Sequence, residues 1–234
     1  MSVDANVDVV LEVVRRRAFA IAVAWPGWTR GGRDEDEALD ALLRAGPRYA
    51  AVVAAAGIEL GPPSDRAVLV VTARLPGDSG TEYGVPSLPL PGDEDPLGDA
   101  ELGRQVAILR AAWAAFDAAV VHHADDELAR GPRGGGRELA KIVLHAEDAE
   151  RAYLNQLGVR PPQGPNGAVP IAEIRAATLA TLRARVLGHE VENPNRVTRP
   201  WSPRRHLRRA AWHALDHAWE IEDRALPRDT VSPA

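Results

Sequence analysis

The stretch that decides the fold of this chain is HLRRAAWHALDHAWEIEDR, residues His206–Arg224. At about 100° per residue, its apolar side chains gather on one arc, as in an amphipathic helix packed on a core. That arc consists of Leu207, Ala210, Ala211, Ala214, Ala218 and Ile221. His213 and His217 lie one turn apart at its edge, with Cβ atoms about 5–6 Å apart, so both imidazoles can reach one ion. His206 lies about 10 Å along the axis from His213, so we expect it to take no part.

Three more helices are predicted before this one, each bounded by glycine or proline. They span Asp99–His122, about Arg137–Leu157 and about Ile171–Leu187. Four helices with one longer connection predict a four-helix bundle over residues 98–226, with a tail at 227–234.

The first 76 residues have a different pattern and predict a small α+β unit. Strands are expected at residues 7–14, 18–24 and 67–74, with a turn at Trp25–Trp28. A helix is expected from the acidic residues 34–37 to about Ala45, where Gly46-Pro47 should end it before a second piece at 48–56. Residues 77–97 are rich in Gly and Pro and form either a linker or a loop lying on the second domain. The predicted fold class is an α+β N-terminal domain followed by an all-α four-helix bundle, predominantly α.

Composition excludes several classes of site. The chain has no cysteine, so disulfides, thiolate metal sites and a cysteine nucleophile are excluded. A net charge of −5 does not indicate a nucleic-acid partner. The one basic cluster, Arg204, Arg205, Arg208 and Arg209, is interpreted as a solvated helix start. We see no signal peptide and no apolar run of membrane length, and therefore expect a cytoplasmic protein without membrane contact.

A third candidate metal ligand lies on the second bundle helix. His145 is at the margin of that helix's apolar stripe, where a histidine by itself is more often structural than a ligand. If the second and fourth helices pack side by side, however, His145 could face His213 and His217. Three neutral imidazoles with one open position have the composition of a catalytic zinc site.

In the arrangement of these three histidines, the sequence resembles the DinB/YfiT-like metal-binding four-helix bundles. The resemblance covers about Asp99–Ala225. It rests on a histidine midway along the second helix, a Gly/Pro loop, and the sequence WHALDHAWEIEDR on the fourth helix. It implies that His145, His213 and His217 bind a divalent ion such as Zn²⁺ or Ni²⁺. The family includes hydrolases and thiol S-transferases, among them mycothiol-dependent maleylpyruvate isomerases, and the resemblance also implies dimers.

The N-terminal domain resembles HicB-like small domains through FAIAVAWPGWTRGGRDEDEALDALL, residues 19–43. In that group a strand ends in a Pro-Gly turn and an acidic helix follows. The resemblance covers no catalytic residue, and no separate DNA-binding segment is visible.

Two charged residues near the histidines have alternative roles. Glu220 is either a general base acting through metal-bound water, an acceptor that fixes the tautomer of a ligating histidine, or a surface carboxylate. Arg209 either binds a substrate carboxylate or is a solvated side chain. Trp212 and Trp219 lie away from the core arc and should bury against the N-terminal domain or a second subunit, which makes a homodimer possible.

The function these residues predict is a metal-dependent enzyme acting on a small molecule. It is either a thiol-dependent S-transferase, with mycothiol or another small thiol as cofactor, or a hydrolase. The alternative is a non-catalytic, metal-stabilised scaffold or regulatory protein with a HicB-like binding domain. An open fourth ligand position with a pocket beside it favours the enzyme, and a fourth protein ligand without a pocket favours the scaffold.

Overall fold

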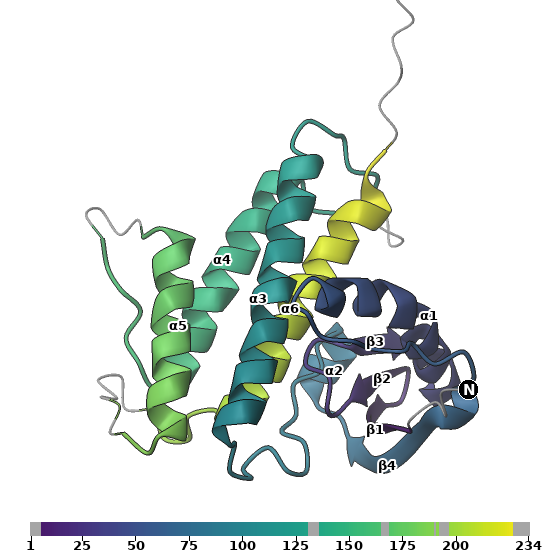
Figure 1. The fold of residues 1–234 in the computed structure, drawn as a ribbon. Helices are drawn as coiled ribbons and strands as arrows, with labels where there is room; N and C mark the ends of the chain where they lie inside the picture. The colour runs from purple at the N-terminus through teal and green to yellow at the C-terminus, as the bar shows by residue number, and fades with distance from the viewer. Residues whose placement is uncertain (1–5, 131–135, 165–168, 190, 192–196, 227–234) are drawn as a thin grey trace, which may run out of the picture.

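A computed structural model describes residues 6–130, 136–164, 169–189, 191 and 197–226 of this chain. An N-terminal sheet with one long helix is followed by four long helices that contact one another, so the predicted fold class is confirmed (Figure 1). The predicted tail, 227–234, lies outside the described residues.

The sheet has four strands in the order β3-β2-β1-β4. The strands are β1 (Val7–Val14), β2 (Arg17–Ala22), β3 (Thr29–Gly32) and β4 (Leu69–Pro76), and a 3₁₀ turn (Arg66–Val68) precedes β4. β1 is central, antiparallel to β2 and parallel to β4. Both faces of β1 are covered, because Val9 and Leu11 belong to the main core and Val10 belongs to a smaller cluster on the opposite face.

Strand β3 was not predicted, because its sequence, TRGG, has weak strand propensity. Its glycines are needed for close packing. A Cβ on Gly31 would lie 2.9 Å from the Phe19 ring, and one on Gly32 would lie 2.4 Å from the backbone nitrogen of Ala38. The start of the following helix therefore packs directly on β3, and that contact selects glycine.

The first helix, α1 (Glu35–Ala54), continues through Pro47, so the predicted break at Gly46-Pro47 is wrong. Asp34 caps its N-terminus by accepting a hydrogen bond from the Glu37 backbone N–H. The Trp28 indole donates to the Leu42 carbonyl (2.9 Å) in the turn before the proline. Burial of this turn against Trp28 offsets the cost of proline inside a helix, which sequence propensity alone does not reveal.

Residues 77–97 lie against both the sheet and the last helix. They contain a short helix, α2 (Ser79–Tyr83). Glu12, fully buried on β1, accepts hydrogen bonds from the Thr81 hydroxyl and from the backbone N–H groups of Ser87 and Leu88. Leu90 completes the small cluster on that face of the sheet. The segment is therefore held by a buried carboxylate and an apolar contact.

The four long helices are α3 (Asp99–His122), α4 (Leu139–Gln156), α5 (Ile171–Val186) and α6 (Pro203–Arg224). Helix α6 contacts all three others and α5 also packs on α3 and α4. One continuous apolar core runs from the sheet through α1 into these helices. In the part of the chain that the structure describes, every helix is too short or too polar to span a membrane.

Trp212 and Trp219 are buried inside this one chain, against the N-terminal residues. Trp212 meets Phe19 of β2 edge-on, with ring centroids 6.4 Å apart. The Arg30 guanidinium of β3 lies 3.9 Å above the Trp219 ring. These contacts account for both tryptophans without a second subunit, and the homodimer stays a prediction.

Replacing Trp219 with alanine should lower the free energy of unfolding by about 3–5 kcal/mol, because the indole is 3% exposed and truncation leaves a cavity. Denaturant unfolding would measure the change. Val121 on α3 is 77% exposed, so Val121→Ala should change the free energy of unfolding by less than about 0.5 kcal/mol. Equal effects of the two substitutions would contradict the burial of Trp219.

Candidate metal centre

Three histidines meet where α4 packs on α6. His145 comes from α4, and His213 and His217 come from successive turns of α6. One ring nitrogen from each lies within 4.8 Å of the others. The cluster predicted from spacing is therefore present, although His145 is 68 residues before His213 in the chain.

The spacing of the rings suits a small divalent ion. The Nε2 atoms of His145 and His213 lie 3.4 Å apart. Two imidazoles bound tetrahedrally at 2.0–2.1 Å would have their nitrogens about 3.3–3.4 Å apart. The ring of His217 has its centroid 4.5 Å from that of His213 and 5.0 Å from that of His145. All three imidazoles can thus donate to one point with small side-chain rotations.

A carboxylate and a guanidinium orient His217. Nδ1 of His217 lies 2.8 Å from a Glu220 oxygen, which leaves Nε2 as the ligand atom. The other Glu220 oxygen accepts from Arg224 (2.5 Å). Arg224 also donates to the carbonyls of Ala129 and Arg137, both 2.9 Å away. Sequence analysis missed Arg224, although its spacing of four from Glu220 on a helix was the available signal.

Burial favours the neutral, metal-binding form of His145 and His213. His213 and His217 are buried, and His145 is half-buried. Burial lowers the pKa of His213 well below its ordinary value, and the nearby positive charges of His217 and Arg209 add to the effect. Burial also lowers the pKa of His145, with a smaller contribution from Arg137. Protons therefore compete less well with a metal ion at His145 and His213 than at exposed imidazoles.

Arg209 lies one turn before His213 and is not a freely solvated side chain. Its guanidinium lies 4.5 Å from the Trp212 ring and 5.5 Å from the Tyr153 ring, and donates to the Pro86 carbonyl. The other arginines of this cluster also have protein partners, so the interpretation of the cluster as a solvated helix start is wrong. Arg204 pairs with Glu101, Arg208 pairs with Asp93, and Arg205 donates to the Ser87 carbonyl. The partners lie mainly in residues 77–97, whose position the sequence did not reveal.

His206 is separate from the cluster, as its position in the sequence predicted. It is 1% exposed between the rings of Tyr153 and Trp201, and neither ring nitrogen has a hydrogen-bond partner among the described residues. Burial lowers its pKa from 6.5 to about 3. The imidazole therefore stays neutral in the folded protein at pH values where an exposed histidine is charged.

This burial predicts a pH dependence of stability. Between pH 6.5 and about 3 the unfolded chain takes up a proton at His206 that the folded chain does not, so stability falls as pH falls. His206→Phe should remove this contribution, which amounts to at most about 1.4 kcal/mol per pH unit. Denaturant unfolding of metal-free protein between pH 4 and 7 would measure both slopes. The control is His189→Phe, because His189 is exposed. If the free energy of unfolding depends on pH in the same way in the parent and in His206→Phe, His206 is not the source of the pH dependence.

No protein-family model, curated protein or solved structure matches this chain. The arrangement of the three histidines, and the groups that orient them, are therefore the observations from which a function can be argued.

Proposed function

We propose that this protein is a metal-dependent enzyme in which His145, His213 and His217 hold a divalent ion, Zn²⁺ or Ni²⁺, for chemistry on a small molecule. The observation that carries the proposal is the convergence of three nitrogens from two helices within 4.8 Å. The donor set also fits, because neutral imidazole is a preferred ligand of both ions.

The number of ligands favours catalysis over a scaffold role. Structural zinc sites are closed by four protein ligands, whereas catalytic sites keep one position for water or substrate. Within the described ranges, the group around these histidines contains no fourth histidine, aspartate or glutamate ligand. His145 is half-buried, so the cluster is partly exposed to solvent.

Bound at this site, a divalent ion would act as a Lewis acid and lower the pKa of a coordinated water or thiol. Water as the nucleophile gives the hydrolase branch, and a small external thiol such as mycothiol gives the S-transferase branch. The chain itself has no cysteine, so the thiol would come from outside. Turnover assays on metal-loaded protein test the proposal. One series contains candidate thiols, and the other contains ester or amide substrates without thiol, so the assays distinguish an S-transferase from a hydrolase.

Glu220 is better placed to position His217 than to act as a general base. One of its oxygens accepts from His217 and the other from Arg224, so both are occupied. The hydrogen bond from His217 is the largest cause of the lowered pKa of Glu220, which keeps it ionised and a strong acceptor. We therefore propose that Glu220 fixes the His217 tautomer and that Arg224 holds Glu220 in place.

Alanine substitution of any one of His145, His213 and His217 should lower metal affinity by at least about 100-fold, because two histidines leave the ion largely to water. Calorimetric titration of chelator-treated protein with Zn²⁺ would measure this. The metal should also raise the unfolding temperature of the parent and not that of these variants. His189→Ala and His206→Ala should bind metal as the parent does. Full affinity in His145→Ala would disprove the cross-helix site.

Glu220→Ala should lower metal affinity by about 10–100-fold, because His217 loses the partner that orients it. Glu222→Ala is the matched control, since Glu222 lies on the same helix and pairs with Arg48 of α1 rather than with a histidine. The same titration compares the two variants. Parent-like affinity in Glu220→Ala would rule out the positioning role.

A further inference from the structure

An open hollow lies on the N-terminal domain, where the turn between β1 and β2, strand β3 and helix α1 meet the side of α6 that carries Trp212 and Asp216. Its volume is about 550 Å³, which lies within the range of about 300–1,000 Å³ that is usual for small-molecule sites. None of the three histidines lines the hollow, so it is separate from the proposed metal centre.

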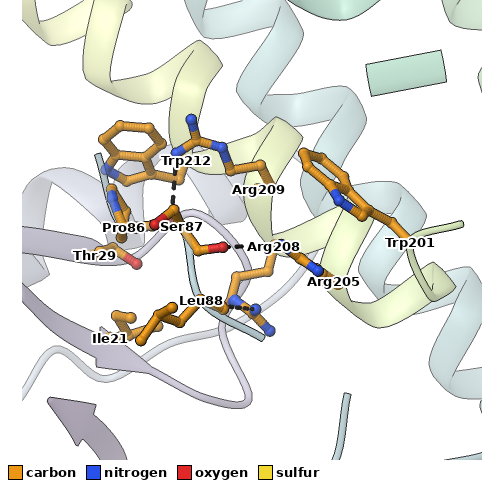
Figure 2. Close-up of a pocket in the computed structure, with 10 residues that line it drawn as sticks. All are labelled: Ile21, Thr29, Pro86, Ser87, Leu88, Trp201, Arg205, Arg208, Arg209 and Trp212. Carbon is orange, nitrogen blue, oxygen red and sulfur yellow. Dashed lines mark hydrogen bonds between the residues drawn. The ribbon is translucent and has the colours of Figure 1, made fainter. Parts of the chain in front are cut away.

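The hollow is strongly basic. Its charged lining consists of five arginines and two carboxylates, namely Arg16, Arg17, Arg30, Arg33, Arg44, Glu37 and Asp216. The excess is three positive charges, on a chain whose net charge is −5. Trp212 also lines the small cavity in Figure 2, whose three arginines are already bonded to backbone carbonyls of residues 86–88. The basic character of the larger hollow therefore comes from the N-terminal domain.

The two carboxylates of the hollow are already engaged. Asp216 pairs with Arg30 (3.4 Å), whose guanidinium is stacked on Trp219. Glu37 accepts a hydrogen bond from Nε of Arg33 (2.9 Å). Hydrogen bonding to Arg33 is the largest cause of the lowered pKa of Glu37, and the charge of Arg44 makes a smaller contribution. Each carboxylate is thus matched mainly to one arginine.

Three guanidiniums keep their donors free. Those of Arg16, Arg17 and Arg44 form neither an ion pair nor a hydrogen bond within the described part of the chain. Arg17 lies against Gly84, where a Cβ would collide with its guanidinium. A guanidinium has five N–H groups in a planar fork that matches the oxygens of phosphate, so these side chains can bind an anion with several oxygens.

Other acidic residues near the hollow do not cancel its charge. Glu82 and Arg15 line an adjoining hollow and add one charge of each sign. Asp34 caps α1, where the positive end of the helix dipole offsets its charge. Apart from Glu37, the acidic residues in the first two turns of α1 pair with Arg66 or Arg74.

The lining favours recognition by charge over recognition by stacking. Phe19 and Trp212 are the aromatic residues of the hollow, and each is only 5% exposed, so neither offers much surface to a flat ring. A ligand would therefore be bound through its negative charges. Two linked phosphates carry more charge and more acceptor oxygens than a single carboxylate, and can engage several guanidiniums at once.

We propose that this hollow binds the diphosphate group of a small molecule, whose oxygens accept hydrogen bonds from Arg16, Arg17 and Arg44. A long nucleic acid fits less well, because acidic residues at the start of α1 border the hollow and the whole chain is acidic. The site goes beyond the proposed metal-dependent reaction and does not depend on it.

Inorganic pyrophosphate is the first probe. The sample is chelator-treated full-length protein, so that no metal can join phosphate to the histidines. Calorimetric titration at low salt should give one saturable site, with a dissociation constant at least about tenfold lower than that of orthophosphate. Adenosine diphosphate should bind about as tightly as pyrophosphate, and a much tighter complex would identify a nucleotide as the source of the diphosphate.

Three results of this titration would overturn the proposal. They are an absence of pyrophosphate binding, equal affinity for pyrophosphate and orthophosphate, and tighter binding of single-stranded DNA than of pyrophosphate. The last result would show an extended nucleic-acid surface instead of a small-molecule site.

Variants assign the binding to this hollow. Arg16→Gln and Arg44→Gln should each weaken pyrophosphate binding by about three- to tenfold, and both positions are exposed, so the unfolding temperature should not change. Arg44→Lys keeps the charge without the fork and should bind with an affinity between those of Arg44→Gln and the parent.

The matched control is Arg110→Gln, which removes one positive charge at an exposed position of α3 outside the hollow. This variant should bind pyrophosphate as the parent does. Parent-like binding in both Arg16→Gln and Arg44→Gln, or an equal loss in Arg110→Gln, would disprove the site.

Discussion

The burial of helix α6 on more than one side is the constraint on which the rest of the structure depends. Its apolar arc packs into the bundle core, and Trp212 and Trp219 pack against β2, β3 and α1. A helix buried on two sides has little surface left for solvent. Its histidines lie at the boundary between these contacts, where α4 closes over them and brings His145 within reach. The three-histidine cluster is therefore a consequence of how α6 is enclosed.

Charged side chains hold residues 77–97 across α6 and the sheet. Glu12 is fully buried and accepts three hydrogen bonds from this segment, which compensates the cost of removing the carboxylate from water. From the other side, Arg205, Arg208 and Arg209 donate to its carbonyls, and Arg208 also pairs with Asp93.

The three-histidine cluster is held in place by side chains that are not themselves candidate ligands. Arg224 joins Glu220 to the carbonyl of Arg137, two residues before α4 begins, so the orientation of His217 is tied to the helix that carries His145. Tyr153 packs edge-on against His213, with ring centroids 5.6 Å apart, and limits its rotation. Such fixed side chains need little reordering when a ligand binds, which favours affinity.

Local sequence determined the four C-terminal helices through their apolar periodicity, and the pairing of His213 with His217 through their spacing along one helix. It predicted the bounds of α3, and it also singled out His145, whose proximity to the pair required the packing of α4 on α6. Strand β3 and the unbroken α1 were not predictable, because contacts with Phe19, Ala38 and Trp28 override the weak propensities of Gly31, Gly32 and Pro47. The partners of the arginines and tryptophans of α6 were likewise set by the tertiary structure. The carbonyl partners of Arg205 and Arg209 lie 118 and 123 residues away in the chain, and no local pattern records which distant surface a side chain will meet.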